Sequence, residues 1–250
     1  MRGAAGWAVL TGVSGGIGRA AAVALQRAGY QVLGVDKDEG ESAADCDAFL
    51  GFDLAEVGQS EIAGNDLLEK IRQRIGLEPL SLLVNNAAVQ HLGPSQGLAW
   101  SDWIDTLYVN LSAPFALTRG LLPELRRSRG TVINVGSVHA KATKPNFVAY
   151  ATSKSALHGL TQAMAVDVGP EVRVLCVAPA AIDTPMLRAG FQQRPEGLNE
   201  LEAVHPLGRI GRPSDVGEAI VWLASPGAGF MSGSVLWLDG GIMSRLHDPD

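Results

Sequence analysis

Short apolar runs alternate with longer amphipathic stretches along most of the chain, and this alternation restricts the fold more than any other feature. The apolar runs are rich in valine, isoleucine and leucine, as is typical of strands that are buried on both faces. Parallel strands need a crossover between them, which is usually a helix. The pattern therefore predicts an α/β fold: a doubly wound parallel sheet of about seven strands with helices on both faces.

The expected strands are residues 7–10, 31–35, 48–52, 81–85, 131–136, 172–178 and 234–238. The expected helices are residues 17–28, 67–74, 100–110, 113–127, 148–168 and 213–224. No repeat or low-complexity linker interrupts them, so we expect one domain over residues 1–250.

Three segments depart from the even spacing. The polar residues 37–47 are too short and too rich in turn residues for a crossover helix, so we expect a loop or a single helical turn there. Residues 185–206 form a long insertion of the kind that often acts as a substrate lid. Residues 244–250 are expected to form a polar carboxyl tail.

Composition limits the partners and the compartment. Hydrophobic residues make up 46% of the chain and charged residues 18%, which indicates a sizeable core. A net charge of -6 disfavours nucleic acid and anionic membrane surfaces as partners. No apolar run is long enough for a signal-peptide core or a membrane span. Cys46 and Cys176 are not part of a zinc-type cluster, so we expect a soluble cytoplasmic protein without a metal.

A glycine-rich turn joins the first expected strand to the first helix. It reads TGVSGGIG from Thr11, and its candidate cofactor contacts are Gly12, Ser14, Gly16, Ile17 and Gly18. Glycine allows the tight turn and the close approach of a pyrophosphate, whose charge then meets the amino end of the helix. This context predicts a dinucleotide-binding, Rossmann-like fold.

Asp36 stands at the carboxyl end of the second expected strand, 18 residues after Gly18. Dinucleotide-binding folds place the acid that binds the ribose roughly 20 residues after the glycine turn, so the spacing fits. A carboxylate there accepts from a ribose 2'-hydroxyl and repels a 2'-phosphate. NAD is therefore favoured over NADP as the cofactor, although Lys37 weakens the preference slightly.

Ser137 ends another expected strand at the carboxyl edge of the sheet, where open α/β sheets bind ligands. Tyr150 and Lys154 are four residues apart and therefore share one face of the next expected helix. An ammonium near a phenol favours the phenolate, so Lys154 is expected to lower the pKa of Tyr150 toward the working range of a proton-transfer group.

With these residues in place, the chain resembles the short-chain dehydrogenase/reductase family from Trp7 to Gly241. The matching pieces are TGVSGGIG from Thr11, Asp53 with Leu54, NNAA from Asn85, Asn110, Ser137, YATSK from Tyr150, PAAIDT from Pro179 and LDGG from Leu238.

The resemblance implies a role for each catalytic candidate. Tyr150 resembles the general acid/base, Lys154 the lysine that lowers its pKa and binds ribose, and Ser137 the serine that orients the substrate carbonyl. Asn110 resembles the residue that holds a proton-relay water.

The resemblance also implies cofactor contacts. Asp53 and Leu54 resemble adenine contacts, while Asn86 and Ala87 line the adenosine and ribose. Ile182 and Thr184 resemble the holders of the nicotinamide carboxamide, and Pro179 belongs to the same set of contacts. Alanine replaces the family's glycine at Ala88 and Ala180. An alanine would be strained there if either position required a positive φ.

The substrate candidates are Gln90, His139, Phe147 and Met186. Gln90 and His139 are similar to residues of small hydroxy-acid dehydrogenases of the family. No cation for a substrate carboxylate is evident, with Lys141 and Lys144 the nearest. His91 and Leu187 are weaker candidates.

The sequence is compatible with three alternative functions. The first is an NAD-dependent oxidoreductase acting on a secondary alcohol or ketone of a small polar substrate, such as a hydroxy acid, a sugar or a cyclic diol. The second is a 3-oxoacyl-carrier-protein reductase, against which Asp36 and the acidic pI argue. The third is a catalytically idle dinucleotide sensor. The resemblance also implies a homotetramer or homodimer.

Overall fold

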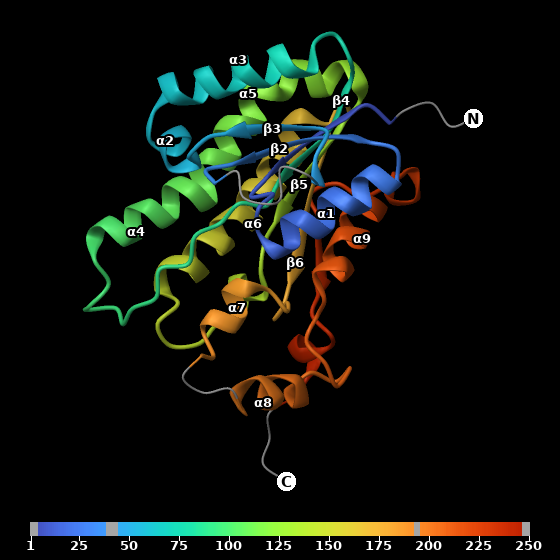
Figure 1. The fold of residues 1–250 in the computed structure, drawn as a ribbon. Coiled ribbons are helices and arrows are strands. Elements are labelled where there is room, and N and C mark those ends of the chain that lie inside the picture. Colours follow the sequence, from blue (N-terminus) through green and yellow to red (C-terminus); the bar gives the residue numbers. More distant parts are fainter. Residues whose placement is uncertain (1–4, 39–44, 193–195, 247–250) are drawn as a thin grey trace.

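The computed structural model describes residues 5–38, 45–192 and 196–246. Within them, seven parallel strands form one sheet in the order β3-β2-β1-β4-β5-β6-β7 (Figure 1). The strands are β1 Trp7–Thr11, β2 Gln31–Asp36, β3 Ala48–Gly51, β4 Leu80–Asn85, β5 Thr131–Val135, β6 Arg173–Pro179 and β7 Val235–Leu238. The predicted doubly wound α/β fold is confirmed.

Helices cover both faces of the sheet. On one face, α1 (Gly16–Arg27) packs against α9 (Pro213–Ala224). The other face carries α2 (Leu54–Gln59), α3 (Glu61–Ile75), α5 (Ala113–Ser128) and α6 (Val148–Val168), with α4 (Trp100–Leu107) beside α6. Figure 1 shows α7 (Pro185–Ala189) and α8 (Glu196–Val204) lying beyond the sheet, on the side of the carboxyl ends of β5 and β6.

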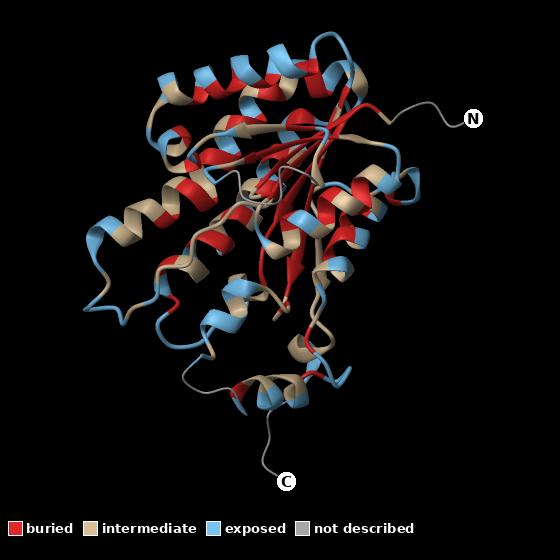
Figure 2. Ribbon diagram, viewed as in Figure 1, coloured by how far each residue is buried: buried red, intermediate tan, exposed pale blue. Residues whose placement is uncertain are grey.

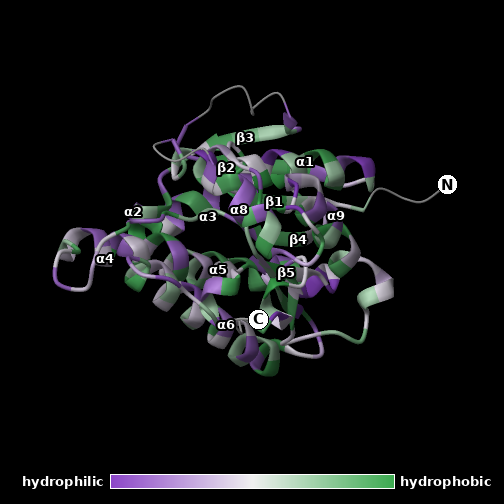
Figure 3. Cartoon of the chain, turned by 90° about the horizontal axis from the view of Figure 1, so that it is seen from below, coloured by the Kyte–Doolittle hydropathy of each residue, from purple (hydrophilic) through white to green (hydrophobic). Residues whose placement is uncertain are grey.

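Each face of the sheet has its own apolar core, because successive side chains of a strand point to opposite faces. In β1, Val9 packs into the core under α3 and α5, whereas Ala8 and Leu10 pack into the core under α1 and α9. Figure 2 shows the central strands buried along their length and the helices buried on one side. In Figure 3 the strands are correspondingly hydrophobic and the helices mixed.

The strand order reverses between β1 and β4. The chain runs from β1 outward to β2 and β3, then returns to β4 on the other side of β1. The connections therefore leave in opposite directions at the carboxyl ends of these two strands. Open α/β sheets bind their ligands in the crevice that this creates.

Several element boundaries differ from the sequence prediction. The helix expected at residues 67–74 is longer, starts at Glu61 and is preceded by α2, because Asp53 and Ser60 cap the two helix starts with their side chains. A π-helical turn, Tyr108–Ser112, joins α4 to α5. The insertion at residues 185–206 contains α7 and α8. Parts of the expected loop and tail, residues 39–44 and 247–250, lie outside the described residues.

None of the helices in the described part of the chain combines the length and the apolar composition needed to cross a bilayer. Groups of three or more His, Cys, Asp or Glu side chains close enough to hold a metal ion are also absent from that part.

Candidate active site

A cavity of about 780 Å³ lies at the carboxyl ends of the central strands. Its wall includes the glycine turn, the loops after β2, β4, β5 and β6, and parts of α7 and α8. Apart from Asn110 and the weaker substrate candidate His91, every catalytic, cofactor and substrate candidate of the sequence lines this cavity. The fold therefore gathers at one place residues that are far apart in the chain.

The glycine turn forms a cradle that side chains would fill. Gly12 has φ +67°, and a Cβ on it would stand 2.7 Å from the Ala87 Cα. A Cβ on Gly18 would collide with the Gly12 carbonyl oxygen. Helix α1 begins at Gly16 without a side-chain cap and without an acidic residue in its first turn. Its amino end is thus open to an anion such as a pyrophosphate.

Asp36 is held in place by backbone donors. Its Oδ2 accepts from the Ser14 amide at 2.9 Å, and its Oδ1 accepts from the Lys37 amide at 2.8 Å. The carboxylate is therefore fixed between the glycine turn and the end of β2. A carboxylate at this place fits the ribose hydroxyls of a dinucleotide.

The turns after β1 and β4 are tied together. Asn86 Nδ2 donates to the carbonyls of Thr11 and Gly12, both at 2.9 Å, and the Asn86 and Ala87 amides donate to Thr11 Oγ1. This holds the loop after β4 against the glycine turn. The alanines at positions 88 and 180 have no positive φ, so the anticipated strain does not arise there.

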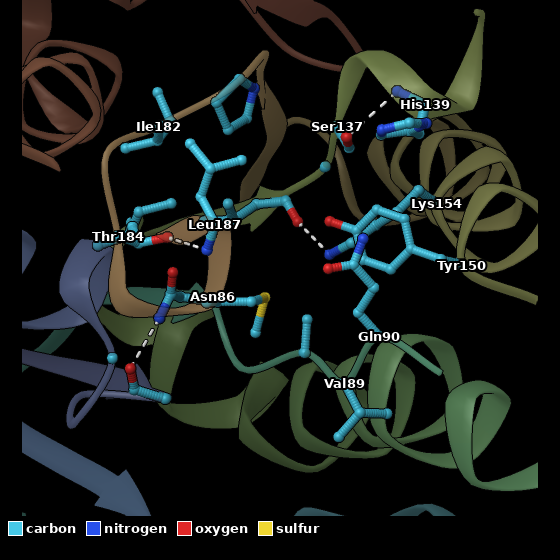
Figure 4. A pocket seen from close by; sticks show the side chains of 18 of the residues that line it. Asn86, Val89, Gln90, Ser137, His139, Tyr150, Lys154, Ile182, Thr184 and Leu187 are labelled. Carbon is cyan, nitrogen blue, oxygen red and sulfur yellow. Dashed lines mark hydrogen bonds between the residues drawn. The ribbon is translucent and has the colours of Figure 1, made fainter. Parts of the chain in front are cut away.

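Ser137, Tyr150 and Lys154 meet at the centre of the cavity, as Figure 4 shows. Ser137 follows β5; its Oγ accepts from the His139 amide at 3.1 Å, and its hydroxyl lies close enough to the Tyr150 phenol to lower the pKa of that group. The Lys154 ammonium lies 5.6 Å from the centre of the Tyr150 ring and donates to the Val135 carbonyl at 2.7 Å. Tyr150 and Lys154 both come from α6, and they lie on one face of that helix.

The pKa of Tyr150 differs from the sequence expectation. Burial raises it above its ordinary value, and the hydrogen bond to Ser137 offsets this only in part. Burial also lowers the pKa of Lys154 to about 8. The net shift of the Tyr150 pKa is therefore upward, because desolvation of the phenolate is its largest cause, and a lowering of this pKa by Lys154 stays a prediction.

Asn110 lies behind the cavity wall, on the π-helical turn. Its Nδ2 donates to the Val89 carbonyl and to Ser153 Oγ, both at 3.0 Å, so both of its side-chain N–H groups are used. Pro114 has no N–H and cannot give the Asn110 carbonyl its usual helical donor. A proton-relay water held by Asn110 stays a prediction.

The substrate end of the cavity has an aromatic wall. The His139 ring stacks on Phe147 with a centroid distance of 4.4 Å, and both rings meet Tyr150 edge-on. Burial and nearby Lys144 lower the pKa of His139 to about 4, so this imidazole is uncharged at neutral pH. His91, by contrast, contacts Asp105 at 2.7 Å.

Sequence reasoning predicted residues 185–206 as a lid but singled out none of the residues that form the far wall of the cavity. It is formed by residues from α8 and from the segment after β7, namely Leu201, His205, Ile242, Met243 and Arg245. They are more than 40 residues from Tyr150 in the chain and match no motif. Only the buried position of His205, a polar residue that is 3% exposed, marks one of them as unusual.

Residues 12–243 match the protein family described as enoyl-(acyl carrier protein) reductase. The chain belongs to the short-chain dehydrogenase/reductase family. A curated relative in this family is 3beta-hydroxysteroid dehydrogenase 1 of Eggerthella lenta, 30% identical, with 94% of this chain and 92% of that protein covered. Another is 3-oxoacyl-[acyl-carrier-protein] reductase FabG of Pseudomonas aeruginosa, 32% identical, with 94% and 96% covered.

The family fold is also found among solved structures. The aldohexose dehydrogenase of Thermoplasma acidophilum superposes with a TM-score of 0.89 at 31% sequence identity, over 97% of this chain and 96% of that one. These short-chain dehydrogenase/reductase relatives are named for sugar, steroid and acyl substrates. The chain is therefore an oxidoreductase of this family, and its own substrate has to be argued from its site.

Proposed function

We propose that this protein is an NAD-dependent dehydrogenase that interconverts a secondary alcohol and a ketone on a small polar substrate. One observation supports the proposal most: Tyr150, with Ser137 beside it and the Lys154 ammonium 5.6 Å from its ring centre, lines the same cavity as the glycine turn and Asp36. A proton-transfer group and a dinucleotide cradle thus share one space.

Asp36 supports NAD as the cofactor. Its carboxylate is fixed by two backbone amides beside the cradle and would face an adenosine ribose there. A 2'-phosphate at this place would meet like charge. The glycine turn and α1 would hold the pyrophosphate. Thr184 lies beside Gly16, and Figure 4 shows Ile182 and Thr184 across from Tyr150, so the nicotinamide would lie between these two residues and Tyr150.

The bound nicotinamide supplies hydride transfer at its C4. Oxidation of the alcohol breaks a C–H bond, whose electron pair leaves as hydride, and an O–H bond, whose proton leaves to the deprotonated (phenolate) form of Tyr150. Reduction reverses both. Ser137 would hydrogen bond the substrate oxygen, because its hydroxyl lines the cavity beside Tyr150. A phenol whose pKa is raised by burial is protonated at neutral pH and can donate to a carbonyl oxygen.

Residues 185–206 are proposed to act as a substrate lid. The described part of this segment carries Met186, Leu187 and His205 into the cavity wall. Its position between the cavity and solvent suits a segment that excludes water during transfer.

We also propose that the protein assembles as a homodimer or homotetramer in a reducing cytoplasm. Phe115 on α5 is 44% exposed, Trp222 on α9 is 45% exposed, and Phe230 is fully exposed. Strand β7 is an edge strand and is only half-buried. Exposed apolar side chains and an unpaired sheet edge are each typical of surfaces that a partner covers. Sedimentation of a monomer at micromolar concentration would contradict this.

The test is a screen of NAD and NADP against a panel of hydroxy acids, sugars, cyclic diols and 3-hydroxyacyl thioesters. We expect reduction of NAD by a small alcohol and loss of that activity in Tyr150→Phe. Preference for NADP with an acyl thioester would favour the carrier-protein reductase instead. Binding of NADH without turnover of any member of the panel would favour an idle sensor.

A further inference from the structure

The loop after β6 is held by the segment that joins α8 to α9. The Gly211 amide donates to the Ala181 carbonyl at 2.8 Å, and the Asp183 amide donates to the Gly211 carbonyl at 2.8 Å. Between these two bonds, Ile182 pairs with Gly211 in an isolated parallel bridge. Ile182 lines the cavity whereas Gly211 does not, so Gly211 supports the loop from behind.

The backbone at position 211 does not itself require glycine. Gly211 does not have a positive φ, so an alanine could adopt its conformation. What stands in the way of a side chain is one methyl group: a Cβ on Gly211 would lie 2.3 Å from the Ile182 Cδ1. The next nearest atoms, the Ala181 carbonyl oxygen and the Ile182 Cγ1, would lie at 3.5 and 3.8 Å, which are ordinary contact distances. Gly211 therefore leaves room for the Cδ1 of Ile182.

The Ile182 side chain has little freedom to move elsewhere. It is buried and belongs to the apolar core under α1 and α9. Such cores are close-packed, so they do not easily take up a displaced methyl group. The cavity that Ile182 lines is the neighbouring volume that side chains do not fill. A methyl group pushed away from position 211 would therefore move toward the cavity.

We propose that Gly211 is a positioning residue for the cofactor: it keeps the Ile182 side chain out of the volume that the nicotinamide fills. This inference rests on the proposed function, in which the nicotinamide lies between Ile182, Thr184 and Tyr150. It needs a nicotinamide dinucleotide but does not depend on whether NAD or NADP is preferred.

The effect of a side chain at position 211 should appear in cofactor binding and not in folding. Without cofactor, only water fills the cavity and it gives way to the displaced methyl group of Ile182. When the nicotinamide enters the same volume, the methyl group has to return toward the added Cβ. The strain of overpacking then weakens binding at the nicotinamide end of the cofactor only.

The experiment measures the affinity of Gly211→Ala for NADH, by fluorescence, and for ADP-ribose, by calorimetry. ADP-ribose has the same adenosine and pyrophosphate but no nicotinamide. We expect NADH to bind at least about fivefold more weakly than to the wild type, and ADP-ribose to bind equally well. The Tm of the variant without cofactor should stay within a few degrees of the wild type. If the wild type prefers NADPH, then NADPH and 2'-phospho-ADP-ribose are the probes.

A second substitution tests whether the Ile182 Cδ1 is the responsible atom. Ile182→Val removes this atom, and the nearest remaining neighbour of the added Cβ is then the Ala181 carbonyl oxygen at 3.5 Å. The double variant Gly211→Ala/Ile182→Val should therefore bind NADH within about twofold of Ile182→Val alone. Gly159→Ala on α6 is the matched control, because a Cβ there would meet no described atom within 4 Å, and its NADH affinity should be that of the wild type.

Wild-type affinity for NADH in Gly211→Ala would overturn the inference and leave the proposed function intact. Equal losses for NADH and ADP-ribose would overturn it too, as would a double variant that binds NADH no better than Gly211→Ala. A Gly211→Ala protein that does not fold would also contradict it, because the strain would then not be relieved in the free protein. Binding of neither NADH nor NADPH to the wild type would instead remove the proposed function, and the inference with it.

Discussion

The side chain of Asn110 forms hydrogen bonds with both the backbone N–H and the backbone C=O of Val89. Asn110 Oδ1 accepts from the Val89 amide at 2.9 Å, and Asn110 Nδ2 donates to the Val89 carbonyl at 3.0 Å. Val89 lines the cavity next to Gln90, and Asn110 is buried on the π-helical turn behind it. The amide thus sets the path of the loop that carries the substrate candidates after β4.

Asn110→Asp is expected to weaken this positioning. The carboxylate keeps an acceptor for the Val89 amide but cannot donate to the Val89 carbonyl or to Ser153. Leaving buried polar groups unpaired costs about 1–3 kcal/mol each, so the Tm should fall. A role in positioning also predicts a raised KM for the alcohol with little change in NADH binding. A variant with wild-type Tm and KM would contradict it.

Tyr150→Phe removes one hydroxyl group and should leave the fold and NADH binding intact. Turnover should fall by roughly 10²- to 10⁴-fold, which is the contribution of a positioned proton donor or acceptor. Steady-state kinetics in both directions, with NADH fluorescence titration as the control, would measure this. Near wild-type oxidation in the variant would mean that another group carries the proton.

Asp36→Ala should weaken NAD binding and narrow its advantage over NADP, because it removes both the ribose acceptor and the repulsion of a 2'-phosphate. The ratio of kcat/KM values for the two cofactors is the measurement. Lys37→Ala is the matched control at the neighbouring position and should leave NAD as the preferred cofactor. An unchanged ratio in Asp36→Ala would exclude the assigned role.

Lys154 makes the stability of the protein depend on pH. Its pKa falls from 10.5 to about 8 on folding, because burial disfavours the ammonium. Above pH 8 the unfolded chain binds more protons than the folded one at this residue, so stability rises with pH from about 8 toward 10.5.

The test is the free energy of unfolding in urea of Lys154→Met and of the wild type, each at pH 7 and pH 9. From pH 7 to 9 the wild type should gain about 1 kcal/mol relative to the variant. Cys46 and Cys176, whose pKa values burial raises to about 11 and about 12, act in the opposite direction from about pH 9. Both cysteines are present in each protein. Lys154 lowers the pKa of Cys176, so its removal raises that pKa further, and the folded Cys176 thiol stays protonated at pH 9 in both proteins. A pH-independent difference would refute the shift.

His139 should stay uncharged throughout the range in which histidines usually titrate. Its pKa is lowered to about 4 by burial and by Lys144, so the pH dependence of kcat/KM should show no His139 inflection between pH 5 and 8. Its imidazole resonance, assigned by comparison with His139→Gln, should not move over that range. Because an unfolded histidine binds its proton near pH 6.5, His139 lowers stability as the pH falls from about 6.5 to 4.

Local sequence patterns predicted much of the fold and of the site. Helix α6 has the predicted limits, residues 148–168, and helix α9 starts at Pro213 as its sequence indicated. The glycine turn, Asp36 and the Ser137, Tyr150 and Lys154 set were found from spacing, because each depends on the chain within one or two elements. Backbone geometry over such short distances is determined by a few neighbouring residues.

The tertiary structure alone decided what depends on burial and on distant segments. The sequence places Tyr150 and Lys154 on one helix face, but only packing shows that desolvation raises the tyrosine pKa. In the same way, nothing near His205 in the sequence connects it with Tyr150, since α8 reaches the cavity only after the chain has passed through β6. Desolvation depends on every atom around a group, and a cavity wall depends on how all the elements pack, so neither can be read from local sequence.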